Sequence, residues 1–563
     1  MEITDGLLPP AGHGEAGADA DDLAVTALLN CLLREVARPD GPEPGAYLLP
    51  ATGRVLRVRG ERHPGRPALR TPGGWRELTL AELVTLVSAE LRAGTGVGND
   101  ALPAEILHSR DVTAALLAAR RTAAPPADPY LRSEQALVAG HRYHPAPKAR
   151  GGSGPKAWLR YSPEAHASFA LPLLGVPAED LVEEGDTTGL DLLGHAFGPD
   201  LPGGFAAGPD RLDGSAAGPD RLDGFAAAQD LPGGFAAGGL VALPAHPWQV
   251  ELLGGLRGGR LRHLGVTAAV AAPTASIRTV YLPEADLFCK FSLDVRITND
   301  VRRLWLRDLR RLPVVADALD VAFDDLPCHL PRPAVLRDRG YRSARLGSDG
   351  GEALAVIVRD GLREHLRPGL TPLLSAAIAE GFPGNPLDGL GEEQAMAWWG
   401  GYLDHVVPPL LHAYLRHGVV LECHLQNVLI AVDGQGMPAQ AVFRDHEGVK
   451  LVADRHPALQ DAPLVSRSYA WERLVYCLVT NHLQEIAGSV AARHPGLRAE
   501  LWARARAVFA AAGKDHDDPE ELRDLLSAAY VPAKANLTLR WLGADGGDMR
   551  CVPVPNPLRL FTP

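Results

Sequence analysis

The segment 418–432, GVVLECHLQNVLIAV, places four polar side chains inside an otherwise apolar run. These side chains are Glu422, His424, Gln426 and Asn427. A buried polar group without a partner costs about 1–3 kcal/mol on protein mutational scales, so the fold must supply partners for them. A DGQG turn at 433–436 and a second apolar run, AVFRDHEGV, come next. This order predicts a β-hairpin that carries polar groups to a ligand.

Oxygen-bearing side chains at the two ends of this hairpin are suited to a metal ion. Asn427 precedes the first strand, and Asp445 lies just past the return strand. Together they can hold Mg²⁺, which prefers hard oxygen ligands and usually bridges nucleotide phosphates. The order H-x-x-N, strand, turn, strand, D-x-x-G resembles the catalytic segment of kinase-like phosphotransferases. We therefore expect a nucleotide site at this hairpin.

Lys290 lies inside another apolar strand, LFCKFSL. The strand lysine of kinases pairs with phosphate, whereas an isolated lysine can simply snorkel from a half-buried strand. His424 and Asn427 could likewise be satisfied polar groups of the core. The strand lysine and the hairpin together favour nucleotide binding. Phosphoryl transfer is less favoured, because no Gly-rich loop precedes Lys290 and no Asp stands where a kinase accepts a hydroxyl proton.

Three basic segments predict an anionic substrate beside the nucleotide. They are AGHRYHPAPKARGG (139–152), PTASIRTVYLP (273–283) and KFSLDVRITNDVRRL (290–304). Arginine binds carboxylates and phosphates with a forked geometry, and neighbouring hydroxyl and amide groups favour oxyanion recognition. The net charge of the chain is −12, so this local excess of cations indicates an anion pocket. The first segment could also be a basic surface loop, and Arg296 and Arg303 could form surface ion pairs.

The overall charge and composition exclude several classes of function. A net negative chain is a poor match for nucleic acid, because binding the phosphate backbone needs a basic face. Residues 1–22 are acidic and lack the regions of a signal peptide, and the apolar run 23–33 is too short to span a bilayer. Six dispersed cysteines without CxxC or metal spacing predict reduced thiols. We expect a cytoplasmic protein without a membrane anchor.

Periodicity predicts the secondary structure around these motifs. Helices are expected over 21–38, after Thr79, over 393–417 with a stop at Gly418, and around 469–487 and 498–512. Strands are expected within 266–295 and at 353–359. The Gly/Pro-rich stretches 41–78 and 93–104 are expected to be loops. With 563 residues, the chain is long enough for more than one domain.

Residues 195–239 contain four tandem ten-residue units, HAFGPDLPGG, FAAGPDRLDG, SAAGPDRLDG and FAAAQDLPGG. Short repeats can form solenoids, and Gly/Asp repeats can bind calcium. These units lack the GGxGxDxUx pattern, however, and offer few large apolar residues. The composition favours a weakly ordered surface insert. We expect it to carry no chemistry.

An ordered set of motifs resembles the IucA/IucC family, the siderophore synthetases that work independently of non-ribosomal peptide synthetases (NIS synthetases). The motifs are GHxxHPxxKxR (140–150), ASIRT (275–279), KFSLDVRITNDVR (290–302), ECHLQN (422–427) and RDHEG (444–448). LLNCLLRE (28–35), NHL (481–483) and AKANLTLR (533–540) resemble further segments of that family. The sequence departs from the family pattern at Arg142, where a proline is usual, and at Cys423, where Ala or Gly is common.

The resemblance implies a multi-domain α+β fold shaped like a cupped hand. Its parts would be an N-terminal helical thumb (1–135), fingers with an antiparallel sheet (136–385, including the insert), and a kinase-like, largely helical palm (386–563). The palm also resembles a region found in ferric reductase FhuF-like proteins. A homodimer is a further implication of the resemblance.

The resemblance also implies an acyl-adenylate-forming ligase that uses ATP and Mg²⁺ in siderophore biosynthesis. Citrate, or a citryl or other dicarboxylate derivative, would attack the α-phosphate. The adenylate would then react with an amine, hydroxylamine or alcohol, so that AMP and pyrophosphate are released. The ATP contacts would be Ser276, Arg278, Thr279, Lys290, Gln426, Asn427 and Asp445. The metal ligands would be Glu422, Asn427 and Asp445. The carboxylate would meet His144, Lys148, Thr298, Asn299, Arg302 and His424, and the catalytic groups would be Lys290, Arg302, His424 and His144.

Two other functions stay open at this stage. A kinase-like small-molecule phosphotransferase would share ATP and Mg²⁺ but release ADP. A non-catalytic iron- or siderophore-handling protein would share the C-terminal resemblance. It predicts a cysteine cluster for iron–sulfur ligation, whereas the cysteines of this chain are dispersed. The sequence leaves the acid and the nucleophile undetermined.

Overall fold

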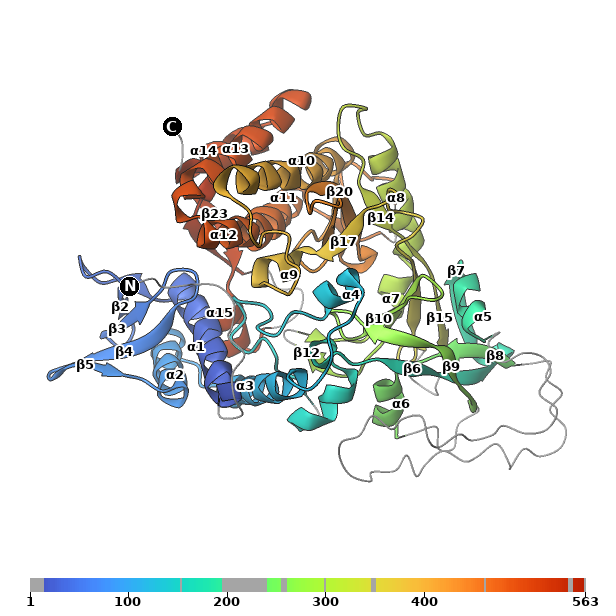
Figure 1. Cartoon of the computed structure of the whole chain (residues 1–563), viewed down its shortest axis with the longest axis horizontal. Helices are drawn as coiled ribbons and strands as arrows, with labels where there is room; N and C mark the ends of the chain where they lie inside the picture. Colours follow the sequence, from blue (N-terminus) through green and yellow to red (C-terminus); the bar gives the residue numbers. More distant parts are fainter. Residues whose placement is uncertain are drawn as a thin grey trace.

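A computed structural model describes residues 15–151, 154–194, 240–254, 261–297, 300–345, 351–459, 462–544 and 550–560. The decapeptide insert (195–239) and the candidate substrate contacts Thr298 and Asn299 lie outside these residues. The described chain is a mixed α/β structure whose larger sheets have five, eight and four strands. Figure 1 shows the N-terminal residues in blue, the strands of the eight-stranded sheet mainly in green shades and the C-terminal helices in orange and red.

The N-terminal residues form helices that pack with a short meander sheet. Helix α1 (Glu15–Glu35) contacts α2 (Leu80–Thr95) and α3 (Ala101–Arg120). Helix α2 starts with a capping box, in which the Thr79 hydroxyl accepts from the Glu82 N–H and the Glu82 carboxylate accepts from the Thr79 N–H. Between α1 and α2 lies an antiparallel sheet with its strands in chain order: β1 (Arg38–Pro39), β2 (Ala46–Leu49), β3 (Arg54–Arg59), β4 (Gly65–Thr71) and β5 (Gly74–Glu77).

This sheet shows that the expectation of a loop at 41–78 is wrong. Its strands are only two to seven residues long, so a period is hard to detect in the sequence. In β3, Leu56 and Val58 are buried and alternate with Arg57 and Arg59. The arginines therefore obscure the apolar pattern of this strand in the sequence. The expected loop at 93–104 is also shorter than predicted, because α2 continues to Thr95 and α3 starts at Ala101.

The middle of the chain forms an antiparallel sheet in the order β7-β15-β16-β11-β10-β9-β6-β8. The strands are β6 (Phe169–Pro177), β7 (Leu181–Gly185), β8 (Leu240–Pro244), β9 (Arg262–Pro273), β10 (Thr279–Leu282), β11 (Leu287–Phe291), β15 (Asp338–Ala344) and β16 (Val356–Asp360). The strands expected within 266–295 and at 353–359 are confirmed. Every residue of β11 is buried, which explains the continuous apolar run around Lys290. Shorter elements surround the sheet: α4 (Pro129–Glu134), α5 (Thr188–Gly194), α6 (Pro247–Leu252), β12 (Arg296–Ile297), β13 (Asp300–Val301), α7 (Leu306–Leu309) and α8 (Leu312–Asp324).

The C-terminal residues are mostly helical and enclose two small sheets. One sheet contains β14 (Ala334–Leu336), β20 (Pro438–Arg444), β19 (Val428–Val432) and β17 (Thr371–Leu374); the other contains β18 (Val419–Val420), β21 (Lys450–Val452) and β22 (Leu464–Val465). The predicted hairpin is confirmed as the antiparallel pair β19–β20. The predicted helix at 393–417 is α10 (Glu392–His417), which ends at Gly418 in the left-handed conformation, with φ at 67°.

The two helices expected near the C-terminus are present and longer than predicted. Helix α11 (Arg467–Val475) continues through a π-helical segment (Tyr476–Leu483) into α12 (Gln484–Arg493), and α13 (Arg498–Asp515) follows. The remaining elements are α9 (Ser375–Glu380), α14 (Glu520–Ser527), β23 (Tyr530–Lys534), α15 (Asn536–Trp541), β24 (Cys551–Pro555) and α16 (Pro557–Leu560). Among the described residues, every helix is too short or too polar to span a bilayer.

Each of the three largest hydrophobic cores lies mainly in one of these three parts of the chain. Two of the cores also include residues from another part. The C-terminal core extends to α4 and to Phe288 of the eight-stranded sheet. The N-terminal core includes Leu537 and Trp541 of α15. The Leu537 and Thr538 N–H groups both donate to the Glu35 carboxylate at the end of α1, at 2.8 Å. Figure 1 shows α15 in red beside the blue helices α1 and α3.

Candidate active site

A large cleft lies where the three parts of the described chain meet. It has a volume of about 3330 Å³ and is lined by the N-terminal helices, the eight-stranded sheet and the C-terminal helices. Roughly twice as many Lys and Arg residues as Asp and Glu residues line it. A chain with a net charge of −12 thus gathers cations on one concave surface, which raises the local concentration of anionic ligands.

Lys290 is a buried cation of this cleft. It lies in β11 opposite Thr279 of β10, and only 2% of the residue is exposed. Its ammonium nitrogen is 2.5 Å from Asp445 Oδ1 and 2.8 Å from Glu447 Oε2. A buried charge needs such partners, so Lys290 does not snorkel to solvent. The structure therefore brings together the strand lysine and the carboxylate at the end of the hairpin.

The turn before β10 directs a second cation to the same carboxylates. Ile277 has φ at 61°, which is a true outlier for a β-branched residue. The neighbouring hydroxyls of Ser276 and Thr279 lie 3.2 Å apart and hydrogen-bond across the turn. The turn brings Arg278 Nη2 to 3.5 Å from Glu447 Oε2. Backbone strain of about 1–3 kcal/mol is typical of sites whose geometry is functional.

Asp445 lies at the centre of the charge cluster, directly after β20. Its φ is 78°, a conformation that Asp tolerates better than most residues. Its Oδ1 also lies 3.3 Å from Arg359 Nη2, and Arg359 pairs in turn with the buried Asp338. Burial alone would raise the pKa of Asp445, but the charges of Lys290 and Arg359 hold it well below its usual range. Asp445 is therefore ionised, as a metal ligand must be.

Glu422 is a second carboxylate of the cleft and faces a different cation. Its Oε1 lies 2.8 Å from Arg473 Nη2. A Cβ atom at Gly448 would collide with its carboxylate, so the glycine of RDHEG makes room for this side chain. Burial would raise the pKa of Glu422, but Arg473 and His424 together lower it. Glu422 is close enough to Asp445 that the two carboxylates repel each other, which opposes this decrease in pKa.

The residues after Glu422 form a turn that is held by hydrogen bonds between side chains and backbone groups. The Gln426 carbonyl accepts two hydrogen bonds from Arg444, at 3.1 and 2.8 Å. Asn427 Nδ2 donates to the Glu422 carbonyl at 3.0 Å, so the side-chain oxygen is the atom of Asn427 that can ligate a metal ion. His424 Nδ1 accepts from the Gln426 N–H at 3.3 Å, so a neutral ring carries its proton on Nε2. Burial lowers the pKa of His424 and favours that neutral form.

Glu134 of α4 joins the turn before β10 to the hairpin. Its Oε2 accepts from the Ala275 N–H at 3.0 Å, and its Oε1 accepts from Arg444 Nη1 at 2.6 Å. The Glu134 and Arg444 side chains are 0% and 5% exposed. Because Ala275 precedes Ser276 and Arg444 precedes Asp445, this carboxylate fixes the two halves of the candidate nucleotide site against each other.

Residues 144–150 of the basic segment are mostly buried, so the interpretation as a surface loop is wrong for this part. Lys148 and Arg150 both pair with Glu164, at 2.5 and 2.8 Å. Burial alone would raise the pKa of Glu164, but Arg150 and Lys148 lower it to about 2. The buried His144 accepts the Ala146 N–H on Nδ1 at 3.1 Å, so its neutral ring carries a proton on Nε2.

Arg142, which departs from the family pattern, has a structural partner in Glu485 of α12. Arg142 Nη1 lies 2.7 Å from Glu485 Oε2, and Arg62 Nη2 lies 3.3 Å from the same oxygen. Only 9% of the Glu485 side chain is exposed. Burial alone would raise the pKa of Glu485, but Arg142 and Arg62 lower it to about 2. This ion pair fastens the basic segment to the C-terminal helices.

Glu485→Gln is expected to remove a pH-dependent contribution to the free energy of unfolding. Because the pKa of Glu485 is lower in the folded state, the ionised carboxylate contributes its full stabilisation above about pH 4.5. This contribution is lost as the pH falls toward 2. Wild type should exceed the variant by up to about 3 kcal/mol in the free energy of unfolding near neutral pH, and by much less near pH ~3. Urea unfolding at both pH values measures this difference.

Glu61→Gln is the matched control for that experiment. The Glu61 carboxylate pairs with Arg498 at 2.8 Å, but its side chain is 80% exposed. Exposed ion pairs contribute less than about 1 kcal/mol, so this variant should differ little from wild type at either pH. A difference for Glu485→Gln that does not change with pH would contradict the assignment.

Two family matches cover most of the chain. Residues 129–380 match the IucA/IucC family, and residues 396–549 match the family described as ferric iron reductase FhuF-like transporter. The first match contains Lys290 and the turn at Arg278, and the second contains Glu422 and Asp445. The chain contains a domain of the IucA/IucC family.

Relatives of this IucA/IucC chain include enzymes of siderophore synthesis. The L-2,3-diaminopropanoate–citrate ligase of Staphylococcus aureus is 26% identical over 77% of this chain and 75% of its own length. The rhizobactin siderophore biosynthesis protein RhbC of Rhizobium meliloti is 28% identical over 79% of each chain. The aerobactin synthase of Escherichia coli is 25% identical over 76% of this chain and 77% of its own.

Solved structures share the fold of this IucA/IucC chain. ATP-bound aerobactin synthetase IucA from Klebsiella pneumoniae aligns with a TM-score of 0.74 and 21% identity, over 96% of this chain and 99% of that chain. The petrobactin biosynthesis protein AsbB from Bacillus anthracis aligns with a TM-score of 0.71 and 16% identity, over 97% and 96%. At these identities, the likeness shows the fold.

The IucA/IucC motifs of the sequence converge on one cleft. All candidate residues within the described chain line it: His144, Lys148, Ser276, Arg278, Thr279, Lys290, Arg302, Glu422, His424, Gln426, Asn427 and Asp445. Several of these candidates are already paired with protein groups of opposite charge: Lys148 with Glu164, Glu422 with Arg473, Arg278 with Glu447, and Lys290 with Asp445 and Glu447. Of the two arginines expected in surface ion pairs, Arg303 pairs with Asp294 at 2.7 Å.

Sequence reasoning missed several residues that line the IucA/IucC cleft or support it. Glu447 lies two residues after Asp445 inside RDHEG, and the second carboxylate of that motif was the available signal. Arg359 ends the apolar strand ALAVIVR, so the signal used for Lys290 would have found it. Glu134 had no comparable signal, because its partners Ala275 and Arg444 are 141 and 310 positions away.

Proposed function

We propose that the protein is a siderophore-biosynthesis ligase that activates a carboxylate with Mg-ATP and joins it to an amine, hydroxylamine or alcohol. The cluster of Lys290, Arg278, Asp445 and Glu447 in a cationic cleft carries this proposal. It offers cations to phosphate beside ionised carboxylates for a divalent cation. The names of the citrate ligases among the relatives support citrate or a citryl derivative as the acid.

The residues fit ATP and Mg²⁺ by the chemistry of their donors. Lys290 and Arg278 supply the charge for phosphate, and the other proposed ATP contacts are Ser276, Thr279, Gln426, Asn427 and Asp445. Hard oxygen donors for Mg²⁺ come from Asp445, Glu422 and Asn427, and Glu447 adds a further carboxylate next to Lys290. When bound, Mg²⁺ supplies positive charge that offsets the charge on the phosphate oxygens.

The proposed reaction has two steps. In the first, a carboxylate oxygen bonds to the α-phosphorus while the bond to the β-phosphate oxygen breaks, and pyrophosphate leaves. In the second, the nucleophile bonds to the acyl carbon, loses a proton and displaces AMP. Lys290 and Arg278 counter the phosphate charge in the first step. His144, His424 and Arg302 line the cleft and are the proposed contacts of the acid.

The architecture that we propose is the cupped hand of thumb (1–135), fingers (136–385) and palm (386–563). The positions of the cores support this division, although α4 and α8 pack into the C-terminal core and α15 packs into the N-terminal core. The family resemblance also carries the expectation of a homodimer that acts in the cytoplasm on small molecules.

Nucleotide product analysis tests the proposed function. The full-length protein would receive Mg-ATP, hydroxylamine and a panel of acids that includes citrate, a citryl monoamide, α-ketoglutarate and succinylated hydroxamates. AMP and pyrophosphate that form only with certain acids would support the ligase and identify the acid. ADP would favour a phosphotransferase, and an absence of turnover with every acid would contradict the proposal.

The cysteines count against an iron–sulfur protein. All six are free, and four of them are buried. None belongs to a group of three potential metal-binding His, Cys, Asp or Glu side chains within the described residues. An iron–sulfur cluster is held by several cysteine thiolates in one place.

Arg302→Ala is expected to lower kcat/KM for the acid by about 10²-fold. The Arg302 carbonyl accepts from Arg278 Nη1 at 3.0 Å, and its N–H donates to the Val295 carbonyl at 3.0 Å. This fixed backbone positions a cleft-lining guanidinium for a carboxylate. The KM for the acid should therefore rise more than the KM for ATP. Initial rates over both concentrations measure the difference.

Arg160→Ala is the matched control, because the Arg160 side chain is 59% exposed and pairs with Glu251. Its kinetic constants should equal those of wild type. A variant at Arg302 with an unchanged KM for every acid would remove this residue from the proposed site.

A further inference from the structure

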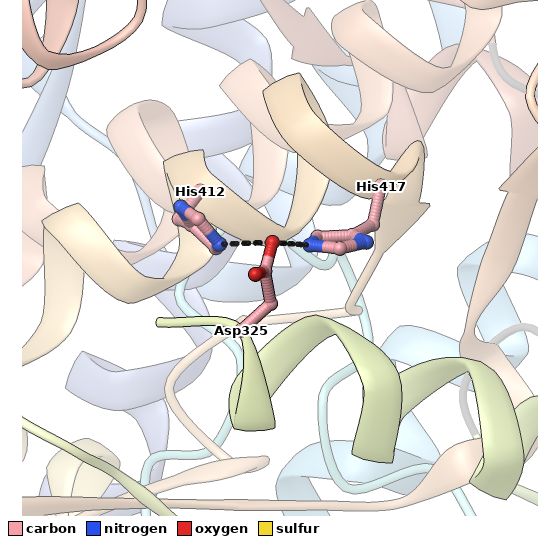
Figure 2. A group of neighbouring side chains, drawn as sticks. All are labelled: Asp325, His412 and His417. Atoms are coloured by element: carbon pink, nitrogen blue, oxygen red, sulfur yellow. Dashed lines mark hydrogen bonds and ion pairs between the residues drawn. The ribbon is translucent and has the colours of Figure 1, made fainter. Parts of the chain in front are cut away.

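A second group of metal-binding side chains lies at the C-terminal end of α10. Figure 2 shows the Asp325 carboxylate between the imidazole rings of His412 and His417. Asp325 directly follows α8, and both histidines belong to α10. None of the three lines the cleft. We propose that these side chains bind a divalent transition-metal ion, with Zn²⁺ as the preferred ion.

The distances are close to those of a tetrahedral site. Asp325 Oδ2 lies 3.0 Å from His417 Nε2 and 3.9 Å from His412 Nε2. The ligand atoms of all three residues lie within 4.8 Å of one another. Ligands about 2.0–2.2 Å from Zn²⁺ at tetrahedral angles are about 3.3–3.6 Å apart. Small side-chain rotations would therefore bring the three ligand atoms around one ion.

His412 provides independent evidence for a ligand. The residue is only 3% exposed, and its Nε2 faces the Asp325 carboxylate in Figure 2. Within the described chain, neither of its ring nitrogens has a hydrogen-bond partner. Buried polar side chains ordinarily have one, and a bound ion would supply it.

The position at a helix end also favours a cation. The last carbonyl groups of a helix carry partial negative charge, and α10 ends at His417. Arg416 is the competing cation, with its Nε 3.7 Å from Asp325 Oδ2. Its side chain is 68% exposed, and such pairs are weak, so a metal ion can displace it.

The donor set selects the ion. Two imidazole nitrogens and one carboxylate are a common set for Zn²⁺ and leave the fourth position for water. The Asp325 side chain is 52% exposed, so solvent can reach the site. A further imidazole, His516, lies 5.3 Å from His412 between ring centroids. The ion would fasten α8 to the end of α10, just before the chain enters the cleft at Glu422.

Metal binding to the untagged, full-length protein tests the proposal. After treatment with a chelator, Zn²⁺ would be titrated in competition with a chromophoric chelator, and Co²⁺ would report the ligand geometry by its visible absorption. We expect one tightly bound ion per chain and tetrahedral Co²⁺ bands. Asp325→Asn should weaken Zn²⁺ binding more than about tenfold, because even changes outside the ligand set have effects of this size.

Asp324→Asn is the matched control. Asp324 is the adjacent carboxylate, its side chain is 87% exposed, and it lies outside the group in Figure 2, so this variant should bind Zn²⁺ as wild type does. His417→Gln, which keeps a polar side chain at the helix end, should lose the Co²⁺ bands. Equal Zn²⁺ affinity in wild type and Asp325→Asn would overturn the proposal. The binding measurement needs no enzymatic turnover, so its result is independent of the proposed function.

Discussion

Lys290→Met is expected to lower kcat/KM for acid-dependent AMP release by about 10³-fold. Methionine keeps an unbranched side chain but removes the charge that lies 2.5 Å from Asp445 and 2.8 Å from Glu447. Both carboxylates would then repel the phosphates of ATP, because one of the three cations facing them, beside Arg278 and Arg359, would be lost. Initial-rate measurements with the acid identified by product analysis give the change, which should appear in kcat as well as in the KM for ATP.

Two variants make this experiment specific. Lys156→Met removes an exposed lysine and should leave the rate unchanged. Lys290→Arg keeps the charge in a different shape and should recover part of the activity, because the position requires a cation more than a particular geometry. The thermal unfolding midpoint of each variant shows whether the fold is retained. A folded Lys290→Met protein with the wild-type rate would remove Lys290 from the proposed mechanism.

Glu134→Ala is expected to reduce the free energy of unfolding by about 3–5 kcal/mol, the usual effect of breaking a buried ion pair. Arg444 would keep its buried charge without the carboxylate that lies 2.6 Å away. The Ala275 N–H would also lose its acceptor. Urea unfolding measures the loss of stability. The affinity for ATP should fall as well, because the turn at 275–279 and the hairpin are no longer held together.

Asp404→Ala is the matched control. Arg504 and Asp404 form a pair at 2.8 Å, but their side chains are 42% and 47% exposed, so the loss should be below about 1 kcal/mol. Replacing both Glu134 and Arg444 by apolar residues should cost less than Glu134→Ala alone, since no buried charge is left unpaired. Equal losses for Glu134→Ala and Asp404→Ala would show that the buried pair does not stabilise the fold.

Local patterns in the sequence predicted the elements that carry the cleft. The helix start after Thr79, the glycine stop at 418 and the DGQG turn are each determined by a few adjacent residues, and the structure shows all three. Lys290 stood out because an unpaired charge is unfavourable in an apolar strand. Asp445 stood out because its carboxylate follows the return strand of the hairpin, where it can serve as a hard oxygen ligand.

Long-range contacts could not be predicted in this way. Glu134 lies in a short helix, and only the fold brings it beside Ala275 and Arg444. Lys148 was expected to face the acid, but Glu164 binds it, and its nearness could not be inferred from the intervening sequence. The strands between residues 38 and 77 also escaped detection, because their stability comes from packing against α1 and α2 more than from a pattern of their own.

During synthesis, the N-terminal core is complete only after α15 has been made. Leu537 and Trp541 are 0% and 1% exposed in a core otherwise built from residues 24–149. Chains leave the ribosome from the N-terminus, and domains generally fold as units in that order. The N-terminal helices therefore lack part of their apolar cover until nearly the whole chain has emerged. The nascent chain presents this surface to chaperones for longer than a domain made of contiguous residues would.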